Sequence, residues 1–345
     1  MTQEEPPNRL RVAATVSFYL VAALAMVMAN KWVLNVTTAP LFFLFTQLVI
    51  AVLLFLASHV LNIVRVPMKF DLPLIKGLTP LVLLNVVALS SNNYTLKYVD
   101  ASFYQVARGL VLPLTVLTSY VYLKSRPSMR ILLSCAIVTA GFFVGVFLDH
   151  TQVSALGVMF GIASSLMTAL HAVVMKRGLD IVGGSALNLS WYSNLLSAVV
   201  LVPCIWAVGE APAVWEILTG EAVGLGTFIG GSTITGALGF LMSIASILSI
   251  KVTSPITHMI SSAIRGVAAS FLGVWLFGDF LSSGRVAAIV VILVGSLDYT
   301  WTKHVESLPA IRTKESYERV PLEDVEEGLA GKQEEEEDMV EVEKV

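Results

Sequence analysis

The sequence is poor in charge. Only 14% of its 345 residues are Asp, Glu, Lys or Arg, and 56% are hydrophobic, whereas a soluble domain carries about 25% charged residues. The charge is also uneven: residues 1–304 hold 17 basic and 11 acidic side chains, and residues 305–345 hold 5 basic and 14 acidic ones. A hydrophobic body with a short acidic end excludes an ordinary soluble enzyme. It also argues against a nucleic-acid-binding protein, which needs a basic face on a soluble domain.

Motifs of catalysis and metal binding are missing as well. The two cysteines, Cys135 and Cys204, lie inside apolar runs and are interpreted as small buried hydrophobic residues. The five histidines lack metal-ligand spacing, and neither a phosphate loop nor a nucleophile elbow is present. No metal and no other cofactor is therefore expected. The polar start of the chain does not resemble a signal or transit peptide, so the first apolar segment is expected to stay as a membrane anchor.

Long apolar segments are abundant. A membrane-spanning helix needs about 20 apolar residues, and ten such segments follow one another along the chain. They cover residues 12–34, 40–63, 75–97, 101–123, 130–148, 153–175, 186–208, 221–249, 254–277 and 285–303. The sequence therefore predicts an all-α integral membrane protein with ten transmembrane helices.

Basic residues indicate the orientation of these helices. With both chain ends in the cytosol, twelve Lys and Arg residues lie on the cytosolic side, and only Lys97 and Arg285 lie opposite. We therefore expect residues 1–11 and 305–345 in the cytosol. The second of these segments is acidic and too polar to form a core, so we expect it to be disordered.

The two halves of the hydrophobic body, residues 12–150 and 151–304, look related. Three residues of the first half recur in the second at an offset of 154–155: Ser128, Arg130 and Gly141 correspond to Ser283, Arg285 and Gly295. Because each half has five helices, the second copy is expected to be inverted across the bilayer. Inverted repeats around a central site are typical of transporters.

Small-residue spacings predict close helix packing. Three GxxxG pairs occur: Gly141/Gly145, Gly157/Gly161 and Gly226/Gly230. This pattern lets two helix backbones approach each other.

Three basic residues lie inside predicted helices, namely Lys31, Arg108 and Arg265. A basic side chain at the centre of a membrane helix costs ~2.5–3.5 kcal/mol on insertion scales, so it usually faces water or a partner. Acidic partners are few, since Asp298 is the clearest intramembrane acid and Asp100 lies at a boundary. We therefore predict that an anionic substrate neutralises the excess positive charge. The alternatives are that Lys31 extends to the membrane surface, and that Arg108 pairs with Asp100 or Asp298.

Arg265 shares one helix face with three other polar residues, His258, Ser261 and Ser262. Hydroxyl groups beside a guanidinium suit a phosphate group. An enzymatic use of the His258–Ser261 pair would lack the orienting acid of a catalytic triad.

Aromatic and amide side chains in three further segments are candidates for binding a base or a sugar: Asn92, Asn93, Tyr104, Trp191, Tyr192 and Asn194. Aromatic rings can stack on a base, and amides can hydrogen-bond to it. Hydrogen bonding between helices is the competing interpretation.

On these segments the chain resembles the Golgi nucleotide-sugar transporters of the drug/metabolite transporter superfamily, most closely the GDP-fucose transporter branch. The likeness runs in order through residues 12–304 and includes Asn30-Lys31-Trp32, residues 92–99 and 103–108, and residues 261–265. In that family a Phe-Tyr-Asn-Asn stretch recognises the nucleotide, and Tyr192 and Asn194 match it while Trp191 and Ser193 depart. Arg265 stands where the family has a Lys.

The resemblance implies import of GDP-fucose into the Golgi lumen in exchange for GMP, by alternating access. Arg108 and Arg265 would hold the diphosphate, with Lys31 as a weaker contact. The remaining candidates divide between the guanine (Trp191, Tyr192 and Asn194) and the sugar (Asn92, Asn93 and Tyr104).

Several alternatives stay open. The departures from the family pattern leave GDP-mannose, a UDP-sugar or a phosphorylated metabolite as other substrates, and an intramembrane enzyme or a receptor as other classes. Residence in the endoplasmic reticulum and a homodimer are open too. Membrane lipids are expected partners and nucleic acids are not. The glycosylation sequon at Asn35 lies so near the membrane that we expect it to be unused.

Overall fold

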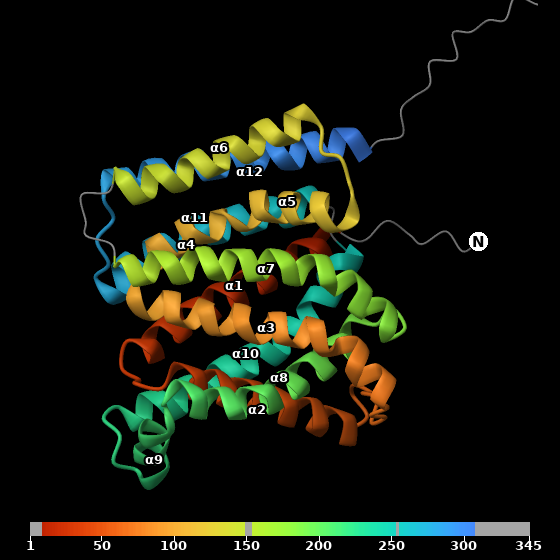
Figure 1. Cartoon of the computed structure of the whole chain (residues 1–345), viewed down its shortest axis with the longest axis vertical. Helices are drawn as coiled ribbons and strands as arrows, with labels where there is room; N and C mark the ends of the chain where they lie inside the picture. The colour runs from red at the N-terminus through yellow and green to blue at the C-terminus, as the bar shows by residue number, and fades with distance from the viewer. Residues whose placement is uncertain (1–8, 149–153, 253–254, 308–345) are drawn as a thin grey trace, which may run out of the picture. The chain divides into compact units, whose positions relative to one another are not determined.

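The structure, a computed structural model, describes residues 9–148, 154–252 and 255–307, and these residues form helices and loops without a strand. Most of the helices are long (Figure 1). Their bounds are α1 Arg9–Leu34, α2 Pro40–Val60, α3 Leu72–Tyr98, α4 Ala101–Gly109, α5 Val111–Leu123, α6 Met129–Phe147, α7 Ala155–Ile181, α8 Ala186–Val208, α9 Ala211–Thr219, α10 Leu225–Val252, α11 Pro255–Phe277 and α12 Ser283–Ser307.

The predicted all-α membrane fold is confirmed. Within the described residues, nine helical segments are long and apolar enough to cross a membrane, with α4 and α5 together forming one of them, Ala101–Leu123. In α11 the stretch Ile264–Phe277 is apolar but shorter. The tenth span and the inverted five-helix repeats remain predictions. The short helix α9, between α8 and α10, was not predicted.

Local chemistry explains several helix ends. The hydroxyl groups of Ser128, Ser154 and Ser185 accept hydrogen bonds from backbone N–H groups in the first turns of α6, α7 and α8, as residues at this position commonly do. Helix α8 ends at Gly209, whose φ of 81° suits glycine. The break between α4 and α5 precedes Pro113, which has no N–H to continue the helical ladder to the carbonyl of Gly109.

The helices pack side by side in layers. Figure 1 shows α6 beside α12, then α4, α5 and α11, then α7 with α1 and α3, and finally α2, α8 and α10. Glycines allow the closest contacts: a Cβ atom at Gly295 of α12 would lie 2.7 Å from the Cγ2 atom of Val138 in α6, and one at Gly145 equally near the Cγ1 atom of Val106 in α4. These contacts place α12 and α6 directly over the helix that carries Arg108.

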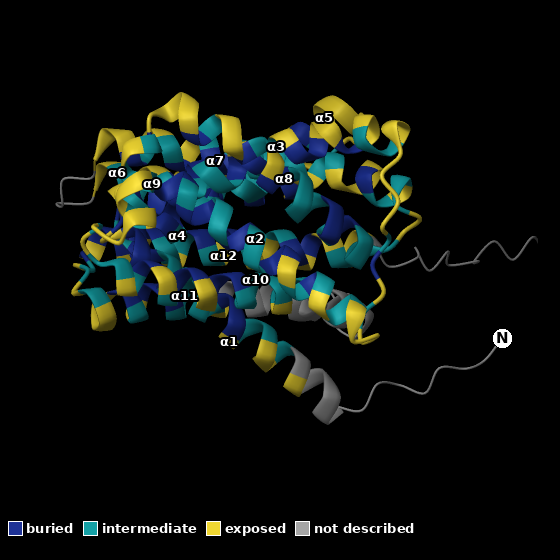
Figure 2. Cartoon of the chain, turned by 90° about the horizontal axis from the view of Figure 1, so that it is seen from below, coloured by how far each residue is buried: buried dark blue, intermediate teal, exposed yellow. Residues whose placement is uncertain are grey.

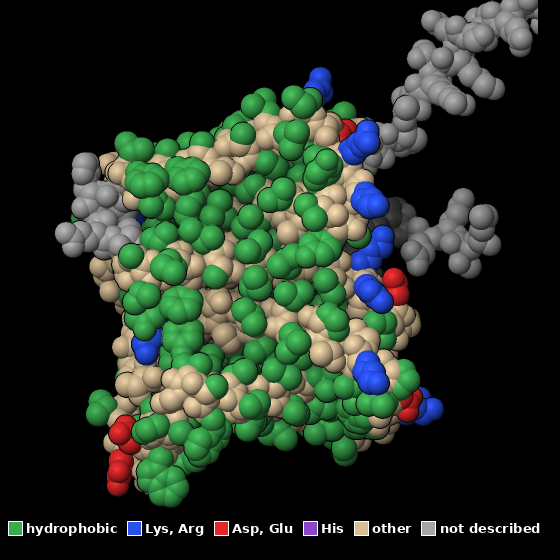
Figure 3. Space-filling model, in the orientation of Figure 1, with side chains coloured by type: hydrophobic (Ala, Val, Ile, Leu, Met, Phe, Trp, Pro, Cys, Tyr) green, Lys and Arg blue, Asp and Glu red, His purple; other side chains and the backbone are tan. Residues whose placement is uncertain are grey.

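Apolar side chains cover the outer faces of the helices. Figure 2 shows buried residues between the helices and exposed residues on the faces that turn outward. In the face drawn in Figure 3, hydrophobic side chains fill the middle, and Lys and Arg side chains gather along one edge. An apolar surface of this kind fits a lipid environment. Exposed basic residues at the helix ends include Arg65, Lys76, Lys124, Arg130, Lys176, Arg177 and Lys303.

Candidate functional site

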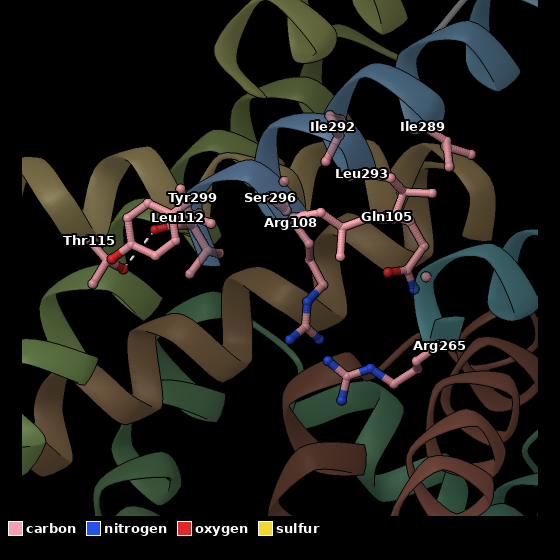
Figure 4. A pocket seen from close by; sticks show the side chains of 14 residues that line it. Gln105, Arg108, Leu112, Thr115, Arg265, Ile289, Ile292, Leu293, Ser296 and Tyr299 are labelled. Atoms are coloured by element: carbon pink, nitrogen blue, oxygen red, sulfur yellow. Dashed lines mark hydrogen bonds between the residues drawn. The ribbon is translucent and has the colours of Figure 1, made fainter. Parts of the chain in front are cut away.

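A cavity of about 350 Å³ lies between α4, α5, α11 and α12 (Figure 4). Its lining is mostly apolar, with two arginines and several uncharged polar groups among aliphatic side chains. The charged and polar lining residues are Gln105, Arg108, Thr115, Arg265, Ser296 and Tyr299. A largely apolar cavity with a few polar groups is the usual form of a small-molecule site.

The two arginines come from different halves of the chain and meet here. Figure 4 shows the guanidinium groups of Arg108, on α4, and Arg265, on α11, pointing toward each other. Both side chains are half-buried, and their charges repel. Two facing cations in a low-dielectric setting attract an anion strongly.

Tyrosine hydroxyl groups hold both arginines. The Nη1 atom of Arg108 donates to the hydroxyl of Tyr104 at 3.2 Å, and its guanidinium lies 5.7 Å from the centre of that ring. Arg265 has a side-chain hydrogen bond with Tyr19 of α1. A neutral hydroxyl fixes the position of a guanidinium without cancelling its charge. The positive character of the site is therefore kept.

Asn92 supports Tyr104 from α3. The hydroxyl of Tyr104 donates to the Oδ1 atom of Asn92 at 3.4 Å, and the hydroxyl of Ser164, on α7, donates to the same oxygen at 2.5 Å. Three residues on three helices, Tyr104, Asn92 and Ser164, thus form a chain of hydrogen bonds that ends at the Arg108 guanidinium. The neighbouring Asn93 is not part of this network, because it is buried and donates to the carbonyl of Pro40 at 3.4 Å.

Lys31 lies away from the arginine pair. It is 5% exposed, and its Nζ atom donates to the carbonyls of Leu96 and Val99 at 2.8 and 2.6 Å. A cation at the last carbonyls of a helix satisfies groups that have no partner within the helix. Lys31 therefore stabilises the end of α3, and it is not among the residues that line the cavity.

The predicted nucleotide-binding stretch on α8 also lies elsewhere. Trp191 and Tyr192 are each 2% exposed. The Nε1 atom of Trp191 donates to the carbonyl of Pro67 at 2.9 Å, and the hydroxyl of Tyr192 donates to that of Lys69 at 2.7 Å. Both side chains hold the α2–α3 connection and are not in the cavity lining. Asn194 is half-buried and is not a lining residue either.

The acidic partners considered for Arg108 are engaged with other residues. Asp298 accepts from the hydroxyl of Ser134 at 2.6 Å, and Asp100 pairs with Arg285 at 2.6 Å. Three predicted site residues on α11, His258, Ser261 and Ser262, have side chains outside the described part of the chain. Among the described residues no group of three or more side chains suited to a metal ion occurs.

Comparison with known proteins identifies the family. The sequence model of the Triose-phosphate Transporter family matches residues 10–300. The chain belongs to this family.

Named relatives agree with a transporter rather than an enzyme. The chain is 32% identical to GDP-fucose transporter 1 of Monosiga brevicollis, with 90% of this chain and 94% of the relative covered. It is also 32% identical to the Golgi GDP-fucose transporter of Drosophila melanogaster, over 87% and 92% of the two chains. A solved protein structure aligns with a TM-score of 0.56 at 14% identity, over 87% of this chain and all of that one, which shows a shared fold alone.

The transporter contains site residues that the sequence analysis missed. Tyr19 carries no charge and lies far along the chain from Arg265, so no spacing connects the two. Ser296 and Tyr299 stand three residues apart on α12 and line the cavity with Ile289 and Ile292. Their 3- and 4-residue spacing is a detectable signal for one helix face.

Proposed function

We propose that this transporter is an antiporter that moves GDP-fucose into the Golgi lumen in exchange for GMP by alternating access. Membership of the family and the printed names of the relatives support a nucleotide sugar as substrate. The observation that carries the proposal is the facing pair of guanidinium groups of Arg108 and Arg265 in a cavity between helices of both halves.

The arginine pair suits a diphosphate. Each guanidinium presents a planar fork of donors that matches two phosphate oxygens, and two forks facing each other match a group with several anionic oxygens. A mononucleotide offers the same phosphate chemistry with fewer oxygens. Both proposed ligands therefore neutralise the same charges.

Neutralisation explains exchange. An uncompensated ion in a low-dielectric interior costs several kcal/mol, and the two arginines also repel each other when no anion is bound. Movement of the empty site across the membrane is therefore slow. Either anionic ligand removes that cost, so the site crosses in both directions only when it is occupied.

The other predicted residues take supporting roles in this proposal. Tyr104 and Asn92 position Arg108, and uncharged groups of the cavity contact the sugar or the base. Four residues remain proposed ligand contacts: Asn194 on α8, and His258, Ser261 and Ser262, which precede Arg265 on α11. Four other predicted residues do not contact the ligand in this proposal but hold the helices and connections around the cavity in place: Lys31, Asn93, Trp191 and Tyr192.

The proposed orientation places the basic edge in the cytosol. Exposed Lys and Arg side chains gather at that edge in Figure 3, and the cytosolic side of membrane proteins is enriched in these residues. One relative is named as a Golgi protein, which supports the same organelle here. Both chain ends would then face the cytosol.

Uptake into liposomes tests the proposal. Purified full-length transporter is reconstituted in liposomes preloaded with GMP, and labelled GDP-fucose is offered outside. We expect Arg265→Ala to lose at least about tenfold in uptake, since one charge-assisted contact is worth ~1.5–3 kcal/mol. Arg177→Ala, which removes an exposed arginine at the end of α7, is the matched control and should keep normal uptake. Normal uptake by Arg265→Ala would contradict the assignment of the site.

A substrate panel separates the remaining alternatives. GDP-mannose, UDP-sugars and triose phosphate are offered to the same liposomes, with GMP, UMP or phosphate inside. Uptake of GDP-fucose above the others supports the proposal. Exchange of triose phosphate against phosphate alone would replace it with the activity for which the family is named.

A further inference from the structure

We propose that Asp100, Asp279 and Arg285 form a lock that holds one end of the transporter closed and that separates when the site opens to that side. The inference rests on alternating access, which is part of the proposed function. The lock lies at the end of the helix bundle where α1, α3 and α11 end and where α4 and α12 begin.

Arg285 is the centre of the lock. It is the second residue after the start of α12 and is only 2% exposed. Its Nη1 atom donates to the carboxylate of Asp100 at 2.6 Å and to the hydroxyl of Ser102 at 2.9 Å. Both acceptors belong to the start of α4. A buried side chain of the second half therefore binds two residues of the first.

Asp279, also of the second half, makes a further contact with the start of α4. Its Oδ2 atom accepts a hydrogen bond from the backbone N–H of Ala101 at 2.8 Å. Lys31, held at the end of α3, interacts electrostatically with both Asp279 and Asp100. Two acidic and two basic side chains, contributed by both halves, thus meet at one place.

The seam beneath these charges is closely packed. Ala101 of α4 and Ala269 of α11 are fully buried and cluster with Met28 of α1. A Cβ atom at Gly273 of α11 would lie 2.9 Å from the Cβ atom of Ala101 and 2.8 Å from the carboxylate of Asp279. Helices α4 and α11, which carry the two site arginines, therefore touch between the arginines and this end. Opening a path to this end requires the contact to separate.

A separate set of hydrogen bonds between the two halves lies at the same end, on the opposite side of the bundle. Glu210, between α8 and α9, is 6% exposed and accepts from the backbone N–H groups of Leu41 and Phe42 at 3.0 and 2.9 Å. The hydroxyl of Tyr94 donates to it at 3.0 Å. These bonds tie the second half to the start of α2. We therefore expect that loss of the lock alone shifts the closed end without unfolding the chain.

The charges make the lock reversible. Buried ion pairs gain Coulomb energy but lose hydration, so the two contributions nearly balance. Here Arg285 is buried whereas the side chain of Asp100 is 40% exposed, so the carboxylate compensates a buried guanidinium and is itself within reach of water. A contact of this kind holds a conformation specifically while remaining easy to separate when water can enter.

The test measures the distance between two spin labels at this end. The labels replace exposed Tyr98, at the end of α3, and exposed Trp275, near the end of α11, in full-length protein whose two native cysteines are changed to alanine. In the substrate-free protein we expect Arg285→Gln to raise the population with a long distance by roughly tenfold or more, the effect of losing a charged hydrogen bond. Glu221→Gln, at an exposed acid next to α9, is the matched control and should leave the distances unchanged.

A double variant in which the two charges are swapped distinguishes loss of the ion pair from misfolding. The double variant Asp100→Arg with Arg285→Asp restores an ion pair in reversed order, and we expect it to recover most of the short distance. If the label-to-label distances in Arg285→Gln equal those of the wild type, the lock is overturned. The lock is also overturned if the double variant has as large a long-distance population as Arg285→Gln. The measurement needs no substrate, so a wild type without nucleotide-sugar uptake would count against the proposed function and not against this result.

Discussion

At the scale of single residues, the site depends on charges that are positioned by uncharged neighbours. Arg108 and Arg265 were predictable because a basic side chain inside a membrane helix is costly and needs a reason. Their supports were harder to find. Tyr19 and Ser164 belong to other helices, and the partners of Lys31 are backbone carbonyls. Counting charged side chains along a sequence reveals none of these contacts.

Tyr104 provides the first residue-scale prediction. Tyr104→Phe keeps the ring but removes the hydroxyl that binds Arg108. We expect the apparent KM for GDP-fucose to rise by about tenfold, equivalent to ~1.4 kcal/mol, because the guanidinium loses its fixed position. Uptake kinetics in GMP-loaded liposomes measure this. Tyr120→Phe, at an exposed position on α5, should leave KM unchanged, and an unchanged KM in Tyr104→Phe would rule out the positioning role.

Asp279 gives a prediction on pH. Burial raises the pKa of its carboxyl group and outweighs the hydrogen bond from the Ala101 backbone, which lowers it; Asp100 also raises the pKa, and Lys31 and Arg285 lower it. A carboxyl whose pKa is higher when the end is closed than when water surrounds it binds a proton more readily in the closed state. Acid should therefore favour the closed end, with the change lying above about pH 3.9, the ordinary value for Asp.

The spin-label distance between positions 98 and 275 measures this pH dependence. The long-distance population should fall as the pH is lowered, and Asp279→Asn should flatten the curve. A rise of that population in acid would show that the assigned direction is wrong.

At the scale of helices, length and apolar composition determined most of what could be predicted. Segments 101–123 and 186–208 were predicted with the bounds that the structure gives. Helix α9 was missed because its nine residues are too few to produce a membrane-span signal. Helix α7 continues to Ile181, beyond the predicted end, since Lys176 and Arg177 interrupt the apolar run without ending the helix.

Glycine spacing was a weaker guide at this scale. Of the three GxxxG pairs, the two on α6 and α7 lie at close contacts, whereas Cβ atoms at Gly226 and Gly230 would meet nothing within 4 Å. The pattern marks where close approach is allowed. Which helix approaches depends on the tertiary structure.

This difference leads to a stability prediction. Gly295→Ala places a Cβ atom 2.7 Å from the Cγ2 atom and 3.0 Å from the backbone nitrogen of Val138, so α6 and α12 must move apart. Overpacking of this kind costs about 1–3 kcal/mol, and we expect a lower Tm in detergent. Gly230→Ala adds the same methyl group in open space and should not lower Tm. Equal Tm values for both variants and the wild type would contradict the packing of α12 on α6.

At the scale of the whole molecule, the described helices bring one arginine from each half to a shared cavity. That meeting was expected from the excess of buried positive charge. The division of labour among the remaining polar residues was not, because several of them secure helix ends and connections. Polar side chains in a membrane protein serve both purposes, and only their partners distinguish the two.

Obligatory exchange is the prediction at this scale. Liposomes without internal nucleotide should take up GDP-fucose at least about tenfold more slowly than liposomes filled with GMP, since return of the empty, doubly charged site is costly. Liposomes filled with guanosine, which lacks the phosphate, are the matched control and should behave as empty ones. Equal initial rates in empty and GMP-filled liposomes would show that the empty site returns freely.

The interruption between α4 and α5 has a mechanical consequence. Because Pro113 supplies no backbone donor, the membrane segment that holds Arg108 already lacks a rung just after the arginine. Bending the segment at this joint does not break a hydrogen bond between residue 113 and the carbonyl of Gly109, because none exists there, so α5 can tilt at a low cost while Arg108 stays in place. The chain thus has a built-in hinge about one helical turn after Arg108.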